Sequence, residues 1–153
     1  MNWFFKPALA MLLLAVALLS ACSSQPEGPQ PPEILYEQDV CASCGMIISE
    51  ATFAAAAALE DGAALKFDDI GDMLRYQPSH PDLEVAAWFV HDTPSEAWLN
   101  AAAATYVLSP AIASPMGHGL AAFADPGQAA SFAAEVDGEV LGWDQIRLRF
   151  QGP

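Results

Sequence analysis

One short sequence pattern occurs twice, at two points where a helix is expected to begin. Residues 67–71 (Phe-Asp-Asp-Ile-Gly) and residues 123–127 (Phe-Ala-Asp-Pro-Gly) both read Phe-x-Asp-x-Gly. Aspartate is a favoured helix N-cap, and proline suits the first helical position. Apolar segments precede and follow both helices, so we expect one strand–strand–helix–strand unit used twice.

The first unit is expected to begin with a hairpin. Residues 52–60 are rich in alanine, which favours helix, but the Asp-Gly pair at 61–62 and the mostly apolar residues 63–68 favour a tight turn between two strands. The remaining elements of this unit are a helix over residues 69–76 that Pro78 stops and a buried strand over residues 84–92.

The second unit repeats this order. It runs through an apolar segment, a loop, a strand, a helix and a further strand: residues 102–108, 109–118, 120–123, 125–136 and 139–141. Residues 45–48 are expected to form a strand, and residues 143–150 a closing turn and final strand. The predicted fold class is α+β, with two similar ββαβ units packed as one compact domain.

The first 21 residues have the pattern of an export signal. Lys6 precedes an apolar run over residues 8–19 that is too short for a comfortable membrane-spanning helix, and small residues lead up to Cys22. The segment Leu-Ser-Ala-Cys at residues 19–22 resembles the lipobox of bacterial lipoproteins, whose cysteine becomes acylated. We therefore expect a lipidated Cys22; the alternative is an ordinary cleaved signal that leaves a free thiol.

These features divide the chain into a signal peptide over residues 1–21, a Pro-rich tether over residues 22–38 and a folded domain over residues 39–153. Lipoproteins that stay in the inner membrane often carry aspartate directly after the acylated cysteine, but this chain has Ser23 there. The absence of aspartate favours a location at the periplasmic face of the outer membrane. The chain holds 19 acidic and 5 basic residues, a net charge of −14, so it repels nucleic acid and offers it no basic groove.

Cys41, Cys44 and Met46 place two thiols and a thioether in one short stretch, Cys-x-x-Cys-Gly-Met. Soft sulfur donors of this kind select Cu(I) over hard cations. Three other meanings of Cys-x-x-Cys stay open: half of a zinc site that His91 or His118 completes, a redox-active pair, and a structural disulfide. The strand–helix–strand context typical of a thioredoxin-like pair is absent.

Three methionines follow the predicted signal peptide: Met46, Met73 and Met116. Methionine is usually a flexible core residue, but each of these lies near cysteine, histidine or an acidic helix start. Cys44 and Met46 are two residues apart, as are Met116 and His118, so each pair faces one side of an extended chain. Together the five residues offer more donors than one Cu(I) ion needs.

Two further motifs, one acidic and one containing histidine, provide weaker candidates for the functional site. Asp68 and Asp69 can supply carboxylate oxygens, although helix capping explains Asp69 without a metal. His91 precedes Asp92, and a carboxylate can orient an imidazole for metal binding or acid–base work. The more ordinary interpretation of His91 is a strand-end histidine bonded to the backbone.

Taken in order, these motifs resemble the NosL family, the accessory lipoproteins of nitrous oxide reductase. The resemblance covers most of residues 39–123 and rests on a lipoprotein signal and four segments: Cys-x-x-Cys-Gly-Met, Phe67-Asp68-Asp69 leading to Met73, Val90-His91-Asp92, and Ser114-Pro115-Met116-Gly117. It implies two ββαβ units related to the organomercurial lyase fold, and Cys44, Met46, Met73 and Met116 as sulfur candidates. His118 matches no family position and rests on spacing alone.

The resemblance further implies a periplasmic Cu(I) carrier that helps to supply nitrous oxide reductase, together with a membrane transporter complex. We therefore predict a binding protein rather than an enzyme; a Gly-rich phosphate loop, Gly-x-Ser-x-Gly and His-Glu-x-x-His are all absent from the sequence. The alternatives are a thiol–disulfide oxidoreductase using Cys41 and Cys44, an organometal-cleaving relative, and a lipoprotein with a structural disulfide and an unrelated binding role.

Overall fold

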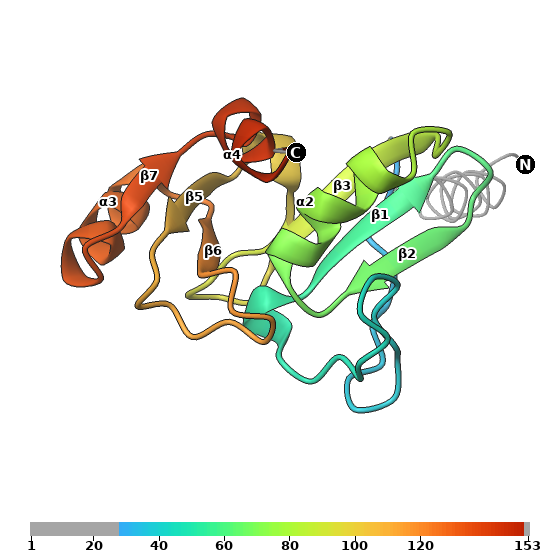
Figure 1. Ribbon diagram of the computed structural model, residues 1–153, viewed down its shortest axis with the longest axis horizontal. Helices are drawn as coiled ribbons and strands as arrows, with labels where there is room; N and C mark the ends of the chain where they lie inside the picture. The colour runs from blue at the N-terminus through green and yellow to red at the C-terminus, as the bar shows by residue number, and fades with distance from the viewer. Residues whose placement is uncertain (1–27, 152–153) are drawn as a thin grey trace, which may run out of the picture.

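The computed structural model describes residues 28–151, which form two antiparallel sheets, each packed against its own helix (Figure 1). The predicted signal peptide and the predicted lipid attachment site, Cys22, lie outside the described residues. Within residues 28–151, no helix has the length and apolar character needed to span a membrane.

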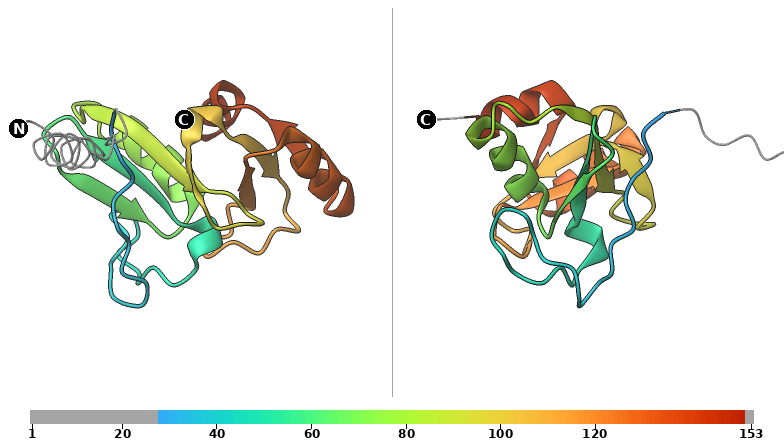
Figure 2. Two further views of the ribbon diagram at one scale, coloured as in Figure 1. Left: turned by 180° about the vertical axis from the view of Figure 1, so that it is seen from behind. Right: turned by 90° about the vertical axis from the view of Figure 1, so that its right-hand side faces the viewer.

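The first sheet has the strand order β2-β1-β3-β4, with β1 at Ala55–Leu59, β2 at Ala64–Phe67, β3 at Val85–His91 and β4 at Trp98–Asn100. The predicted hairpin is confirmed, because β1 pairs antiparallel with β2 across the Asp-Gly turn. The alanines of β1 are largely buried, since helix α2 packs on one face of the sheet and residues 28–36 run along the other (Figure 2). Small side chains let both layers approach closely.

The second sheet has the order β6-β5-β7, with β5 at Thr105–Leu108, β6 at Leu120–Phe123 and β7 at Glu139–Leu141. Helix α3, Pro126–Glu135, packs against all three strands. In each sheet the first strand of the unit lies between the second and the third, so the predicted strand–strand–helix–strand order occurs twice. Three elements lie outside this repeated order. They are strand β4 and two short 3-10 helices, η1 at Ala51–Phe53 and η2 at Ala101–Ala103.

Both predicted helix caps are present. Asp69 accepts a hydrogen bond from the Gly71 N–H at the start of α2, Ile70–Ser79, and Asp125 accepts one from the Gln128 N–H at the start of α3, each at 2.8 Å. These bonds satisfy N–H groups that have no partner inside the helix.

The sequence predicts that α2 stops at Pro78, but the helix continues to Ser79. Proline disturbs a helix by removing one hydrogen bond and crowding the carbonyl of the preceding turn, but here side chains bond carbonyls of the last turn and support it. The Ser79 hydroxyl donates to the Arg75 carbonyl (3.3 Å), and His80 Nδ1 lies 2.8 Å from the Tyr76 carbonyl oxygen. The expected strand over residues 45–48 is also wrong, since Ile47 forms only an isolated bridge with Val40.

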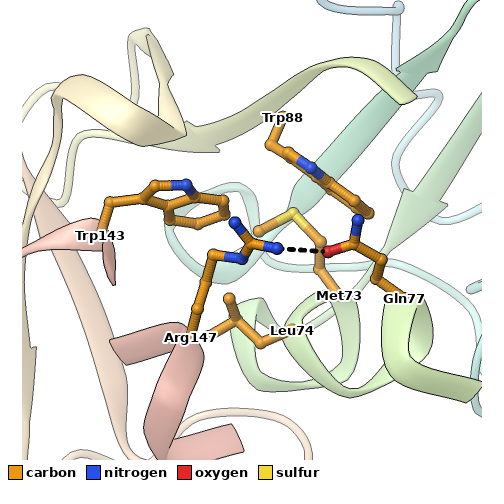
Figure 3. Close-up of a pocket in the computed structure, with 6 residues that line it drawn as sticks. All are labelled: Met73, Leu74, Gln77, Trp88, Trp143 and Arg147. Carbon is orange, nitrogen blue, oxygen red and sulfur yellow. Dashed lines mark hydrogen bonds between the residues drawn. The ribbon is translucent and has the colours of Figure 1, made fainter. Parts of the chain in front are cut away.

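The expected closing strand over residues 143–150 is instead helix α4, Trp143–Phe150. Its first turn is closed by Gln145, whose side chain accepts a hydrogen bond from the Gly142 N–H at 2.8 Å. Residues four apart share a helix face, so Trp143 and Arg147 both turn toward α2, where Arg147 donates to Gln77 at 3.0 Å (Figure 3). In a strand these two residues would also share a face, but a rise of about 3.3 Å per residue would place them about 13 Å apart and lose this packing.

The two units are joined at the start of α2. Asp69 is fully buried, and besides capping α2 its second carboxylate oxygen accepts hydrogen bonds from the Ser114 hydroxyl (2.6 Å) and the Met116 N–H (3.0 Å). Both donors belong to the β5–β6 loop of the second unit. One carboxylate therefore holds this loop against the first unit's helix.

Replacing Asp69 by alanine is expected to lower the free energy of unfolding by about 3 kcal/mol, because the Ser114 and Met116 donors lose a charged acceptor in a largely buried site. Asp125→Ala is the matched control, since it removes only an exposed helix cap and should cost about 1 kcal/mol. Urea unfolding of both variants measures the difference. Equal losses would show that Asp69 acts only as a cap.

Candidate metal centre

The Cys41–Cys44 segment is a tight turn fixed by backbone hydrogen bonds. The Gly45 N–H donates to the Cys41 carbonyl (3.0 Å), and the Cys41 N–H donates to the Met46 carbonyl (2.8 Å). Gly45 has φ +75°, a left-handed conformation in which glycine carries no steric penalty. The Ala42 N–H donates to the Lys66 carbonyl (2.8 Å), which anchors the turn along the edge of β2.

This turn brings both thiols to the N-terminus of α2. Donor atoms of Cys41, Cys44, Asp68 and Asp72 all lie within 4.8 Å of one another, and we call these four residues the thiol–carboxylate cluster. Cys41 Sγ lies 3.6 Å from Asp72 Oδ2, and Cys44 Sγ lies 3.5 Å from Asp68 Oδ1. All are buried except Cys44, which is partly exposed. The cluster is thus a compact set of possible metal ligands.

Asp72 connects the cluster to the second unit through His118. His118 Nε2 lies 3.0 Å from Asp72 Oδ1, while the other carboxylate oxygen faces Cys41. The imidazole packs directly on Gly71, where an added Cβ would come within 2.2 Å of His118 Cγ. Gly71 therefore makes room for the histidine that orients Asp72.

Both thiols are held in the protonated form at neutral pH. Burial raises the pKa of Cys41, and burial together with the nearby Cys41 thiol and the Asp68 charge raises the pKa of Cys44 to about 12. Each S–H can then donate to the facing carboxylate. A cation that binds the sulfurs must displace these protons.

The structure brings most of the predicted metal ligands to one region. Cys41, Cys44 and Met46 share the turn, and the Met46 side chain is 55% exposed beside it. Met116 and His118 lie on the loop that Asp69 and Asp72 bind, and Met116 is 36% exposed. Two segments distant in sequence, each carrying candidate sulfur ligands, thus meet at the start of one helix.

Met73 occupies a different environment. Although it follows Asp72 in α2, its side chain is fully buried. It lines a recess with Leu74 and Gln77 of the same helix, Trp88 of β3 and two residues of α4, and its sulfur faces the two tryptophan rings (Figure 3). Sulfur against aromatic rings is a favourable packing arrangement.

Asp72 is the site residue that sequence reasoning missed, because the helix-start motif drew attention to Asp68 and Asp69 alone. A signal was present: Asp68 and Asp72 are four residues apart and therefore neighbours at the start of a helix. Asp68, Asp69 and Asp72 all lie at the N-terminus of α2, where the positive end of the helix macrodipole favours carboxylates.

His91 lies outside the cluster and has the structural role that its ordinary interpretation predicts. Its Nδ1 lies 3.0 Å from the Ala54 carbonyl oxygen and its Nε2 lies 3.3 Å from the Tyr36 hydroxyl, and the Trp98 ring packs against the imidazole at a tilt of 34°. Burial lowers the pKa of His91, which keeps it neutral. Cys41 and Cys44 are both free thiols in this structure.

The sequence model of the NosL family matches residues 32–150 of this chain. The chain belongs to the NosL family. The copper-binding lipoprotein NosL of Stutzerimonas stutzeri is 32% identical over 149 residues, which cover 88% of this chain and 78% of that protein. The resemblance inferred from the motifs is therefore confirmed.

A solved structure shows the same fold. The crystal structure of the copper chaperone NosL from Shewanella denitrificans aligns with a TM-score of 0.67 over 76% of this chain and 96% of that chain, at 19% identity. Both NosL relatives are named for copper and neither is named as an enzyme, which agrees with the prediction of a binding protein.

Cys44 is expected to react slowly with iodoacetamide at pH 8, because a pKa of about 12 leaves little thiolate. Its rate should be more than tenfold below that of free cysteine and should still rise above pH 9; peptide-level mass spectrometry measures it. Asp68→Asn removes a negative charge and should speed the reaction. A rate profile that levels off below pH 9 would contradict this environment.

Proposed function

We propose that this NosL protein is a periplasmic Cu(I)-binding metallochaperone that delivers copper for the maturation of nitrous oxide reductase. The observation that carries the proposal is the turn in which Cys41 and Cys44 lie together with the exposed Met46. Thiolate and thioether sulfur are the donors that favour Cu(I). The names of the two relatives, one a copper-binding lipoprotein and one a copper chaperone, support the same cargo.

The proposed copper ligands are drawn from the sequence candidates. Cys41, Cys44 and Met46 come from one turn, and Met116 and His118 come from the loop that Asp69 and Asp72 bind. Met73, also a sequence candidate, would have to leave its packing against two tryptophans in order to bind. A Met73 variant therefore tests separately whether this side chain binds Cu(I).

Several features suit a carrier that must release its ion. Met46 is exposed, so a partner's ligands can approach the copper from that side. The raised pKa of both thiols means that protons compete with the metal, which weakens the site and favours transfer. The same raised pKa argues against the oxidoreductase alternative, since redox-active cysteines usually have a lowered pKa.

Location and partners follow from the family resemblance. We propose acylation at Cys22, anchoring at the periplasmic face of the outer membrane, and transfer of copper by way of a membrane transporter complex. The net charge of −14 suits docking to a basic partner surface. The doubled ββαβ order also supports the kinship with the organomercurial lyase fold that the family implies.

In a Cu(I) titration against a competing chelator under reducing conditions, we expect one ion to bind per chain. Cys41→Ser and Cys44→Ser should each weaken binding at least a hundredfold, which corresponds to about 2.7 kcal/mol, and Met46→Leu at least tenfold. Met73→Leu should have little effect if the side chain stays in its recess. Wild-type protein that binds no Cu(I) above background would refute the proposal.

In cells, Cys22→Ser should release the protein from the membrane fraction, and removal of the whole chain should lower the copper content of nitrous oxide reductase. Membrane separation on a density gradient and metal analysis of the purified reductase measure these effects. Complementation by the Cys44→Ser variant should fail if copper is delivered through this site. Full reductase loading in the absence of the chain would contradict the delivery role.

A further inference from the structure

Basic side chains are rare in this acidic protein, and residues 28–151 contain four Lys and Arg residues: Lys66, Arg75, Arg147 and Arg149. Lys66 and Arg149 each bind a carboxylate, at 2.6 Å and 2.7 Å. Arg75 and Arg147 form no ion pair within residues 28–151, although the whole chain carries 19 acidic residues. These two cations therefore remain available to a negative group from outside the chain.

Both unpaired arginines lie where α2 packs against α4, and aromatic rings of α4 hold them in place. Arg75 Cζ lies 5.6 Å from the centre of the Phe150 ring, and Arg147 Cζ lies 5.5 Å from that of Trp143. Arg147 also donates to Gln77 at 3.0 Å (Figure 3). Contact with a ring positions a guanidinium group while leaving N–H donors free for a carboxylate.

An open hollow borders each of these arginines, and one hollow reaches the Cys41–Cys44 turn. The first has a volume of about 310 Å³ and is lined by Ala42, Ser43, Arg75, Tyr76, Ser79 and His80. The second has a volume of about 400 Å³ and is lined by Gln77, Pro78, Pro81, Arg147 and Gln151. Side chains of another protein can enter both hollows, and a protein seated there would lie beside the proposed copper ligands.

The setting of the two arginines favours an acidic protein over a membrane or a second copy of this chain. Residues 28–36, which lead toward the proposed lipid at Cys22, run along the face of the first sheet opposite α2, so the α2 side is turned away from the tether (Figure 2). Two copies that each carry a net charge of −14 repel one another. Arginine and tryptophan are enriched among the residues that dominate protein–protein binding.

We propose that Arg75 and Arg147, with the two hollows beside them, form a docking site for a carboxylate-rich surface of a protein that exchanges copper with this chain. Each guanidinium group binds a carboxylate of that partner through its free N–H donors. A carrier has to dock with a protein that supplies copper and with one that receives it. The acidic remainder of the surface suits a basic partner, and this arginine site suits the other. The inference rests on the proposed carrier function, because the site adjoins the Cys41–Cys44 turn.

The test measures docking by biolayer interferometry on the proposed mature chain, residues 22–153, carrying Cys22→Ser. The probes are copper-free nitrous oxide reductase and the transporter complex in detergent, the two proteins of the proposed delivery route. Arg75→Gln and Arg147→Gln should each weaken binding of one probe about tenfold. Added NaCl should weaken wild-type binding of the same probe, because salt screens exposed ion pairs. The Cu(I) affinity of both variants should equal that of the wild type.

Arg149→Gln is the matched control. It removes the same charge from α4, but Arg149 is already bound to Glu139 at 2.7 Å and 2.8 Å, so docking of the probe should not change. An equal loss in Arg149→Gln and Arg75→Gln would reveal a general effect of charge and would overturn the inference. Circular dichroism checks that each variant is folded. If Arg147→Gln unfolds, the exposed Arg75 decides the outcome.

Three further results would overturn the inference. They are binding of neither probe, arginine-dependent binding to phosphatidylglycerol vesicles in place of a protein, and a dimer in sedimentation equilibrium that either arginine substitution abolishes. A wild-type chain that binds no Cu(I) would instead refute the proposed function. Normal Cu(I) binding together with unchanged docking of both arginine variants would refute this inference alone.

Discussion

The buried carboxylate of Asp69 is the interaction on which the arrangement of this protein depends. It caps α2 with one oxygen and binds the Ser114 hydroxyl and the Met116 N–H with the other. Helix and loop belong to different ββαβ units, so this charged group helps to fix how the two units meet, together with contacts such as the bond from the Ala124 N–H to Asp92. Without it, the loop that carries Met116 and His118 would have no polar attachment to the helix start except through Asp72.

The same helix start explains how three acidic side chains are accommodated in so small a volume. Asp68, Asp69 and Asp72 lie where the free N–H groups and the macrodipole of α2 present positive charge. Asp69 uses that charge for structure, whereas Asp68 and Asp72 face the thiols. The outcome is a site in which burial, together with the Asp68 charge beside Cys44, raises the pKa of the thiols and keeps sulfur protonated until a cation arrives. This balance suits the proposed carrier, which must bind a metal and then release it.

The cluster combines soft and hard donors, and the two kinds lie at different depths. Cys44 and Met46 lie at the accessible side of the turn, where an ion can be handed to a partner, while Asp68 and Asp72 lie beneath it. Selection of copper would rest on the affinity of sulfur for Cu(I) and on the supply of the metal.

Local sequence determined much of this protein: the hairpin at Asp61-Gly62, the two helix caps and the doubled strand–strand–helix–strand order all follow from turn, capping and periodicity rules that act within a few residues. The Cys-x-x-Cys-Gly-Met stretch likewise indicated sulfur chemistry. Only the tertiary structure decided that residues 143–150 are a helix, that Met73 packs against tryptophans, and that Asp72 joins the thiols. Each depends on contacts between segments distant in sequence, about which a local pattern carries no information.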